Sequence, residues 1–175
     1  MSLPSTEAAA LKSCLIDCYN SVKRWKEVHA ETVPVIEAVV AERTQMLTDG
    51  KEDFENNSTL VERSHKLGEL LGKFAPLIEK LRLVKCRLEA VSELICVSDS
   101  EINRLIRLIG GDLETALDQL VQEQRCRWAV VQDLTMTESY DQLVMLTSAW
   151  THQVYLDESA LALFCATVEK TLELL

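Results

Sequence analysis

The chain has 175 residues, of which 47% are hydrophobic, and its 28 Asp and Glu against 18 Lys and Arg give a formal net charge of −10. This length is enough for one domain with a sizeable hydrophobic core. The negative charge would repel a phosphate backbone, so we expect protein partners and no direct nucleic-acid binding.

The first predicted helix covers residues 5–47. Its apolar residues recur at steps of three and four, as in an amphipathic helix, and His29 takes the core slot where the pattern has a gap. Pro34 does not change the phase, so it predicts a kink or two collinear helices. The segment TDGKEDFENNS (48–58) ends the helix. The apolar positions are Leu11, Leu15, Cys18, Val22, Trp25, Val33, Ile36, Val40 and Leu47.

The second predicted helix covers residues 58–96 and carries the longest apolar stripe. Pro76 interrupts it, but residue 72, whose carbonyl the proline ring would strike, is a glycine that can bend away. Basic residues flank the stripe on both sides, either as a solvated margin or as a docking site for an acidic partner. The stripe is Leu67, Leu71, Phe74, Ile78, Leu81, Val84, Leu88, Val91 and Ile95, and the basic residues are Lys80, Arg82, Lys85 and Arg87.

The third predicted helix covers residues 99–135, with candidate caps at 98–100. Gly110 and Gly111 are expected to break it as a hinge or tight turn, after which Asp112 can cap its continuation. A phosphate-binding role for this glycine pair is disfavoured, because Asp112 and Glu114 put negative charge where the anion would lie. The apolar positions after the break are Leu113, Leu117, Leu120, Trp128 and Val131.

A C-terminal helical hairpin is predicted over 138–175. Thr137 is the expected cap of its first helix, which ends near Trp150, and Asp157 with Glu158 begins the second. No segment alternates like a strand. The predicted fold is therefore all-α: one domain, 1–175, forming an elongated antiparallel bundle of long kinked helices with this hairpin at its end.

No sequence window approaches the run of about 20 apolar residues that crosses a bilayer, and the start MSLPSTEAAA lacks signal-peptide features, so we expect an intracellular protein with no membrane contact. The six cysteines are expected to be small core residues. Cys14 and Cys18 share a helix face, but no CxxC pair or suitably spaced His accompanies them, so no metal is expected.

No catalytic constellation is evident either. The three histidines have no nucleophile or metal-ligand pattern around them, and His29 is expected to be a hydrogen-bonded core residue. We therefore expect no enzymatic activity, no catalytic residues and no cofactor.

The stretch AWTHQVYLDES (149–159) gathers Trp150, His152, Gln153 and Tyr155 in a helix end and turn. One interpretation is structural: Trp150 plugs the bundle, Gln153 or His152 caps the helix carbonyls and Tyr155 staples the turn. The other is an interface anchor, since large aromatic residues are enriched at binding hot spots. A buried Trp150 with exposed His152 and Tyr155 would satisfy both.

Residues 130–155, VVQDLTMTESYDQLVMLTSAWTHQVY, resemble the C-terminal region of the cyclin-dependent kinase 2-interacting protein family, which carries a W-x-H-Q-x-Y element. Weaker similarities lie in DCYNSVKRW (17–25), which ends at Trp25, and in residues 66–96. Val154 replaces the proline usual in the family, and SDSEINRLIRLIGG is shorter than the family's insertion. The N-terminal ALKSC, Trp25 and Pro34 also resemble a sister family, a ribosome maturation factor of the same assembly.

The resemblance implies a non-enzymatic nuclear adaptor, with a cytoplasmic pool left open. Its implied partners are a hexameric AAA ATPase of the spermatogenesis-associated type and a paralogous helical subunit, with cyclin-dependent and Cdc7-type kinases as further partners. The implied processes are DNA replication, genome maintenance and large ribosomal subunit maturation. The candidate partner-binding residues are Trp150, His152, Gln153, Tyr155 and Trp25. The alternatives are the sister maturation factor and a coiled-coil tether, although Pro34, Pro76 and Gly110-Gly111 interrupt the strict heptads that a tether needs.

Overall fold

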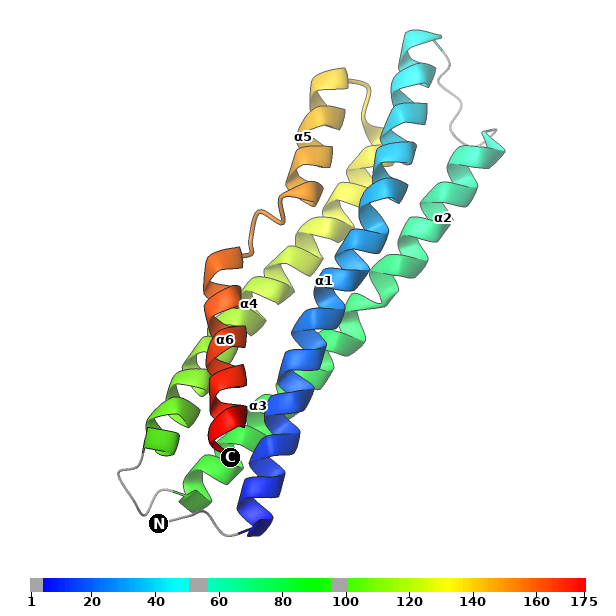
Figure 1. Cartoon of the computed structure of the whole chain (residues 1–175). Coiled ribbons are helices and arrows are strands. Elements are labelled where there is room, and N and C mark those ends of the chain that lie inside the picture. The colour runs from blue at the N-terminus through cyan, green and yellow to red at the C-terminus, as the bar shows by residue number, and fades with distance from the viewer. Residues whose placement is uncertain (1–4, 51–56, 96–100) are drawn as a thin grey trace. The chain divides into compact units, whose positions relative to one another are not determined.

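The computed structural model describes residues 5–50, 57–95 and 101–175, and these form helices and a few turn residues, with no strand among them (Figure 1). The predicted all-α class is therefore confirmed. The helices are α1 (Ser5–Thr48), α2 (Ser58–Gly72), α3 (Phe74–Ile95), α4 (Glu101–Met136), α5 (Tyr140–Thr151) and α6 (Glu158–Leu174).

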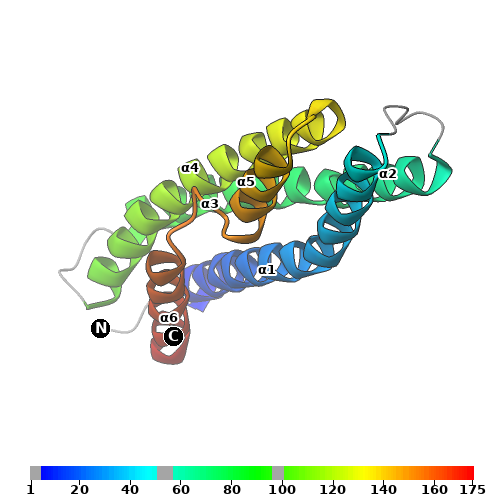
Figure 2. The same ribbon diagram turned by 90° about the horizontal axis from the view of Figure 1, so that it is seen from above.

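The helices form two compact units, and the same elements are seen from above in Figure 2. Unit 1 comprises Met1–Trp25, Pro76–Val121 and Leu156–Leu175, and unit 2 comprises Lys26–Ala75 and Gln122–Tyr155. The helices α1, α3 and α4 contribute residues to both units, whereas α2 and α5 belong to unit 2 and α6 to unit 1. The single domain, the elongated antiparallel arrangement and the C-terminal hairpin stay predictions.

Unit 1 buries one apolar face of each helical segment. Ion pairs close the margins of this core: Lys80 lies 2.8 Å from Asp17, and Lys85 lies 2.8 Å from Glu114. Arg82 pairs with Glu79 and Arg87 lies 4.0 Å from Asp17, so all four basic residues beside the α3 stripe are paired within the chain. Burying each Leu or Val contributes about 1.5–3 kcal/mol. The core includes Leu11, Leu15, Cys18, Val22, Ile78, Leu81, Val84, Leu88, Ile109, Leu113, Leu120, Leu161, Phe164 and Val168.

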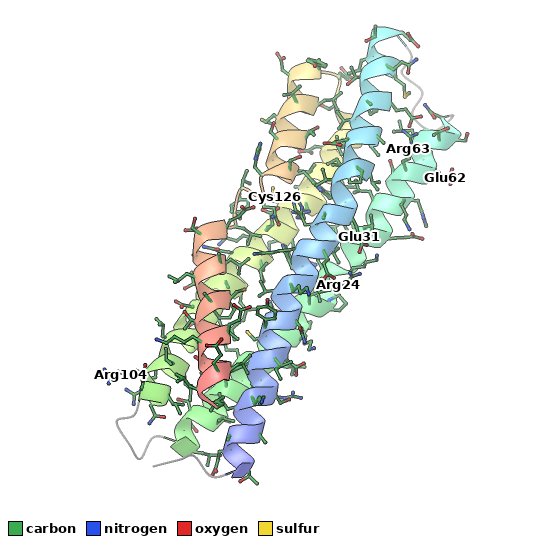
Figure 3. All side chains as sticks on the ribbon, in the orientation of Figure 1. Arg24, Glu31, Glu62, Arg63, Arg104 and Cys126 are labelled. Carbon is green, nitrogen blue, oxygen red and sulfur yellow. The ribbon has the colours of Figure 1, made fainter. Side chains whose placement is uncertain are left out.

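In unit 2, α2 is held at its start and against α1. The side chain of Asn57 accepts a hydrogen bond from the Leu60 backbone N–H at 3.1 Å, a helix cap that contributes about 1 kcal/mol. Arg63 of α2 lies 3.4 Å from Glu42 of α1, and Lys73 lies 2.8 Å from Glu31. Figure 3 labels Arg63 and Glu31 on these two helices. Partly exposed pairs of this kind contribute little individually and mainly fix which faces meet.

The predicted helix 58–96 is in fact two helices, α2 and α3, which are separated at Lys73. Pro76 falls in the first turn of α3, where its missing N–H would have no intrahelical partner. The ring would strike the carbonyl of residue 72, and the break lies directly after this residue. The Lys73 N–H instead bonds the Leu70 carbonyl at 3.0 Å, which caps α2. Residue 96 and the predicted caps at 98–100 lie outside the described residues.

The expected break at Gly110 and Gly111 is wrong, because α4 continues through both. Each glycine in a helix costs about 1 kcal/mol relative to alanine. Ile106, Ile109 and Leu113 are buried on either side in helical register, and their burial outweighs that cost.

A direct test replaces these glycines. A Cβ atom added at Gly110 or Gly111 would meet no atom within 4 Å. Gly110→Ala and Gly111→Ala should therefore each raise the free energy of unfolding by about 0.5–1 kcal/mol, measured by urea denaturation. Gly50 is the control, because its φ of 67° lies in the left-handed region, and Gly50→Ala should destabilise. If Gly110→Ala and Gly111→Ala both lower the free energy of unfolding, the prediction is wrong and the fold requires glycine at these two positions.

The first helix of the predicted hairpin starts later than expected. Ser139, and not Thr137, is the N-cap of α5, and it makes no side-chain cap hydrogen bond. Arg43 Nη2 donates to the Thr137 carbonyl at 2.7 Å, and the Thr137 hydroxyl bonds the Gln142 side chain. These contacts hold Thr137 in the connection between α4 and α5. At α6 the prediction is confirmed, since the Asp157 carboxylate accepts from the Ala160 N–H at 2.9 Å.

Candidate functional site

The core face of α4 carries two charged residues. Glu123 and Arg127 are completely buried, in register with Leu120 before them and Val130 after them. The predicted continuation of the stripe through Trp128 and Val131 is wrong, since Trp128 is 44% exposed and Val131 is only half-buried. The regular spacing of three and four past Leu120 was the available signal, but its first two positions hold the charged residues Glu123 and Arg127.

Arg127 is enclosed by aromatic rings and by the carboxylate of Glu123. Its guanidinium carbon lies 5.0 Å from the centre of the Phe74 ring and 4.9 Å from the centre of the Trp150 ring. Its Nε lies 3.0 Å from Glu123 Oε1, one helical turn earlier. Cation–π contacts of a desolvated guanidinium contribute about 2 kcal/mol. We call Arg127 and these neighbours, with His29 and Gln153, the Arg127 cluster.

Two polar side chains complete the Arg127 cluster. Arg127 Nη2 lies 2.9 Å from His29 Nδ1 and donates to Gln153 Oε1 at 3.3 Å. Because a guanidinium only donates, His29 Nδ1 must accept, so the imidazole is neutral with its proton on Nε2. Burial, and then the charge of Arg127, lower the pKa of His29 to about 4. The expected hydrogen bond of His29 is present, but the residue is only half-buried, and Val28 beside it is the fully buried one.

Burial opposes the charged forms of both members of the ion pair. It raises the pKa of Glu123, while the charge of Arg127 works against this rise. It lowers the pKa of Arg127, while Glu123 works in the opposite direction. A buried pair of this kind adds little net stability, but it is costly to break and it favours one arrangement of the surrounding helices.

Trp150 is fully buried and is fixed by a second hydrogen-bond chain. Its Nε1 donates to Thr32 Oγ1 at 3.0 Å, and that hydroxyl donates to the His29 carbonyl at 2.7 Å. The expected plug is thus present, and it is tied to α1 through Thr32. Thr32 was not predicted to be buried, because a threonine does not extend an apolar pattern.

The turn after α5 points alternate side chains inward and outward. Gln153 is buried and has a φ of 46°, the left-handed region, and the Tyr155 N–H donates to Glu123 Oε2 at 3.2 Å. His152, Val154 and Tyr155 are exposed. The expected closure of the helix end by Gln153 or His152 is made by their backbone N–H groups, while the Gln153 amide oxygen binds Arg127. The helix end is closed by the His152 N–H, which bonds the Ser148 carbonyl at 3.0 Å.

The fifth candidate residue, Trp25, lies apart from this turn in the division of the chain. It belongs to unit 1 and is fully buried. A tryptophan with no accessible surface cannot contact a partner directly in this conformation. Its structural place is in the core, and a partner-binding role for its side chain is not supported by its burial.

The described part of the chain contains no group of three or more His, Cys, Asp and Glu residues that could hold a metal ion. None of its helices is long and apolar enough to cross a membrane. In the Arg127 cluster the cation contacts both the Glu123 carboxylate and the His29 imidazole. The cluster therefore fixes the turn, and the side chains free for contact are those on its outer side.

Comparison with known proteins assigns no family. No protein-family model matches the sequence, and no curated protein matches it.

The pH dependence of stability tests the neutral state of His29. An unfolded His titrates near pH 6.5 and folded His29 near 4, so below pH 6.5 the unfolded chain binds a proton that the folded chain does not. Stability contributed by His29 is therefore present above pH 6.5 and is lost as the pH falls to 4. Because the ring is partly exposed, solvent reduces the loss to about 1–2 kcal/mol.

Glu123 contributes with the opposite sign, because a raised folded pKa favours the folded state as the pH falls. The quantity to measure is therefore the difference in unfolding free energy between the parent and His29→Asn. Asparagine is chosen because its amide oxygen can still accept a hydrogen bond from Arg127. This difference should shrink between pH 6.5 and 4. It should change more than the corresponding difference for the matched exposed residue, His65→Asn. Equal changes would show that His29 is not held neutral.

Proposed function

We propose that this protein is a non-enzymatic adaptor subunit that binds other proteins through the exposed side of the turn after α5. The observation that carries the proposal is that His152 and Tyr155 are exposed on a turn whose inner side is fixed by buried Trp150, Gln153 and Glu123. Such fixing reduces the conformational entropy that a partner must remove on binding.

The composition of this turn supports an interface role. Tyr155 is 47% exposed, and Val154 beside it is also exposed. Tyrosine is enriched at binding hot spots, because it offers a large surface and a hydroxyl group with few rotatable bonds. A left-handed φ at a residue other than glycine, as at Gln153, costs about 1 kcal/mol or more. The turn thus keeps a strained backbone at Gln153 while the Tyr155 ring remains exposed to solvent.

The resemblance of residues 130–155 to the cyclin-dependent kinase 2-interacting protein family supports a more specific proposal. The chain would then act in an assembly with a hexameric AAA ATPase and a paralogous helical subunit, in the nucleus. The processes served would be DNA replication, genome maintenance and large ribosomal subunit maturation, with cell-cycle kinases as further partners.

The test is affinity purification of the tagged full-length chain and of the double variant His152→Ala/Tyr155→Ala. Both side chains are exposed, so the variant should melt within a few degrees of the parent. Retention of the AAA ATPase should fall at least fivefold, as expected when an interface hot spot is removed. Melting and retention should be measured on the same preparations, because a destabilised protein also loses its partners.

The matched control is Val61→Ala/His65→Ala, an exposed aliphatic residue and an exposed histidine one turn apart on α2 of the same unit. It should retain the ATPase as the parent does. Equal retention by the turn variant and the parent would remove the turn from the interface. A parent that captures no AAA ATPase would remove the assembly and leave the coiled-coil tether as the alternative.

A further inference from the structure

A pocket lies between the end of α4 and the start of α5, both within unit 2. Its volume is about 260 Å³. Figures 1 and 2 both show α5 beside the C-terminal end of α4. The pocket is lined by Asp133, Met136, Thr137, Gln142, Met145 and Leu146, and we call it the methionine pocket.

The apolar part of the methionine pocket is unusually open to solvent. Met136 is 82% exposed and Met145 is 62% exposed, while Leu146 is buried. On α5, Tyr140 and Val144 are exposed as well, one helical turn apart. Methionine side chains are flexible and polarizable, and they are over-used on surfaces that accept helices of varied sequence. Apolar side chains gathered at a pocket rimmed by polar groups mark an interaction site.

The exposed charged residues that line this pocket, or lie beside it between α4 and the first turn of α5, are acidic. Asp133 lines it, and Glu138 and Asp141 are exposed in the connection to α5 and in its first turn. The sequence contains no Lys or Arg from Trp128 to Glu169. Arg43 of α1 reaches this end of unit 2, but its side chain is buried and its guanidinium donates to the Thr137 carbonyl. Its charge is therefore withdrawn from the surface that a partner would meet.

We propose that the methionine pocket binds a basic amphipathic helix of a partner protein. Apolar side chains of that helix enter between Met136 and Met145, and its Lys or Arg residues pair with Asp133, Glu138 and Asp141. The volume is below the range of about 300–1,000 Å³ typical of small-molecule sites, and it suits one or two side chains. The acidic rim disfavours nucleic acid and anionic lipid surfaces.

This surface is separate from the turn of the proposed adaptor site. The pocket is at the start of α5, whereas His152 and Tyr155 follow its end, so α5, about 18 Å long at 1.5 Å per residue, lies between them. The inference therefore goes beyond the adaptor function and holds whether or not an AAA ATPase is the partner. If the chain captures no AAA ATPase, the proposed role of the methionine pocket is not affected.

The experiment uses the full chain with ¹³C-labelled methionine methyl groups and a synthetic peptide of Leu and Lys, about five turns long, arranged as an amphipathic helix. Titration should shift the methyl signals of Met136 and Met145 more than that of buried Met46. Two control peptides test whether binding needs the amphipathic pattern and the positive charge. One is a scrambled peptide of the same composition, and the other is a Leu/Glu peptide of the same pattern. Both should bind at least tenfold more weakly.

Two variants locate the binding. Met136→Ser/Met145→Ser should weaken binding of the Leu/Lys peptide at least tenfold. Asp133→Lys/Asp141→Lys should weaken it similarly and should reduce its dependence on salt. The matched control is Leu83→Ser/Leu94→Ser on α3, two leucines of comparable exposure, which should bind as the parent does. Each variant is first checked for an unchanged helical spectrum.

Several results would overturn the proposal. They are equal binding by the methionine variant and the parent, equal binding of the scrambled or acidic peptide, and shifts that avoid Met136 and Met145. Tighter binding to anionic phospholipid vesicles than to the Leu/Lys peptide would assign the surface to membranes instead. If the serine double variant unfolds, Met136→Leu/Met145→Leu keeps the apolar volume, and it should retain binding within threefold.

Discussion

Trp150→Ala is expected to lower the free energy of unfolding by about 3–5 kcal/mol, measured by urea denaturation at neutral pH. The substitution leaves a cavity in unit 2 where a fully buried ring has been. It also removes the hydrogen bond to Thr32 Oγ1 and one of the two rings against the Arg127 guanidinium. A loss of this size is a large share of the stability of a typical domain.

The chain provides a matched control for this change. Trp128 is also in the unit 2 part of α4 but is exposed, so Trp128→Ala should cost less than about 1 kcal/mol. Trp150→Phe should lie between the two alanine variants, because it keeps most of the ring volume and loses the hydrogen bond. If the two alanine variants cost the same, Trp150 is not the plug of unit 2.

Arg127→Leu is expected to cost about 3–5 kcal/mol, because it leaves the Glu123 carboxylate buried without its cation. The Tyr155 N–H would still donate to Glu123 Oε2, but one neutral donor does not replace a guanidinium 3.0 Å from Oε1. The control is Arg125→Leu on the exposed side of α4, which should change stability by less than about 0.5 kcal/mol.

A second substitution separates the loss of charge from the loss of packing. Glu123→Gln added to Arg127→Leu removes the unpaired charge and keeps an acceptor for the Tyr155 N–H. The double variant should recover about 1–3 kcal/mol relative to Arg127→Leu alone. Additive losses would mean that the ion pair is not the reason for the damage.

The all-α class and most helices could be predicted, because apolar spacing and turn residues carry that information locally. The α3 stripe through Leu81 and Leu88 is buried as predicted, and Asp157 caps α6 as predicted. The glycine pair of α4 was misjudged, because the local preference of glycine says nothing about the burial of Ile109 and Leu113 beside it. The prediction counted the helix cost of about 1 kcal/mol per glycine but not the stabilisation from burying these apolar neighbours.

The candidate site was only half visible for a different reason. Trp150 and the exposed His152 and Tyr155 could be inferred from residue types in one short stretch. Glu123 and Arg127 could not, because a core position is recognised in sequence by an apolar residue, and a charge there looks like an exposed face. Only the structure shows that Phe74, His29 and Gln153, from three separate segments, surround the guanidinium.

The segment without Lys or Arg, Trp128 to Glu169, also determines how this protein can be modified and probed. It holds the methionine pocket, α5 and the turn with His152 and Tyr155, yet it offers no ε-amino group. Ubiquitin or acetyl groups attached to lysine therefore cannot be placed on it, and amine-reactive cross-linkers cannot report its contacts. Trypsin, which cleaves after Lys and Arg, should release it as one peptide, Trp128–Lys170. Carboxylate-directed cross-linking at Asp133 or Asp141, or methionine oxidation footprinting at Met136 and Met145, would report on the methionine pocket, where lysine chemistry is silent.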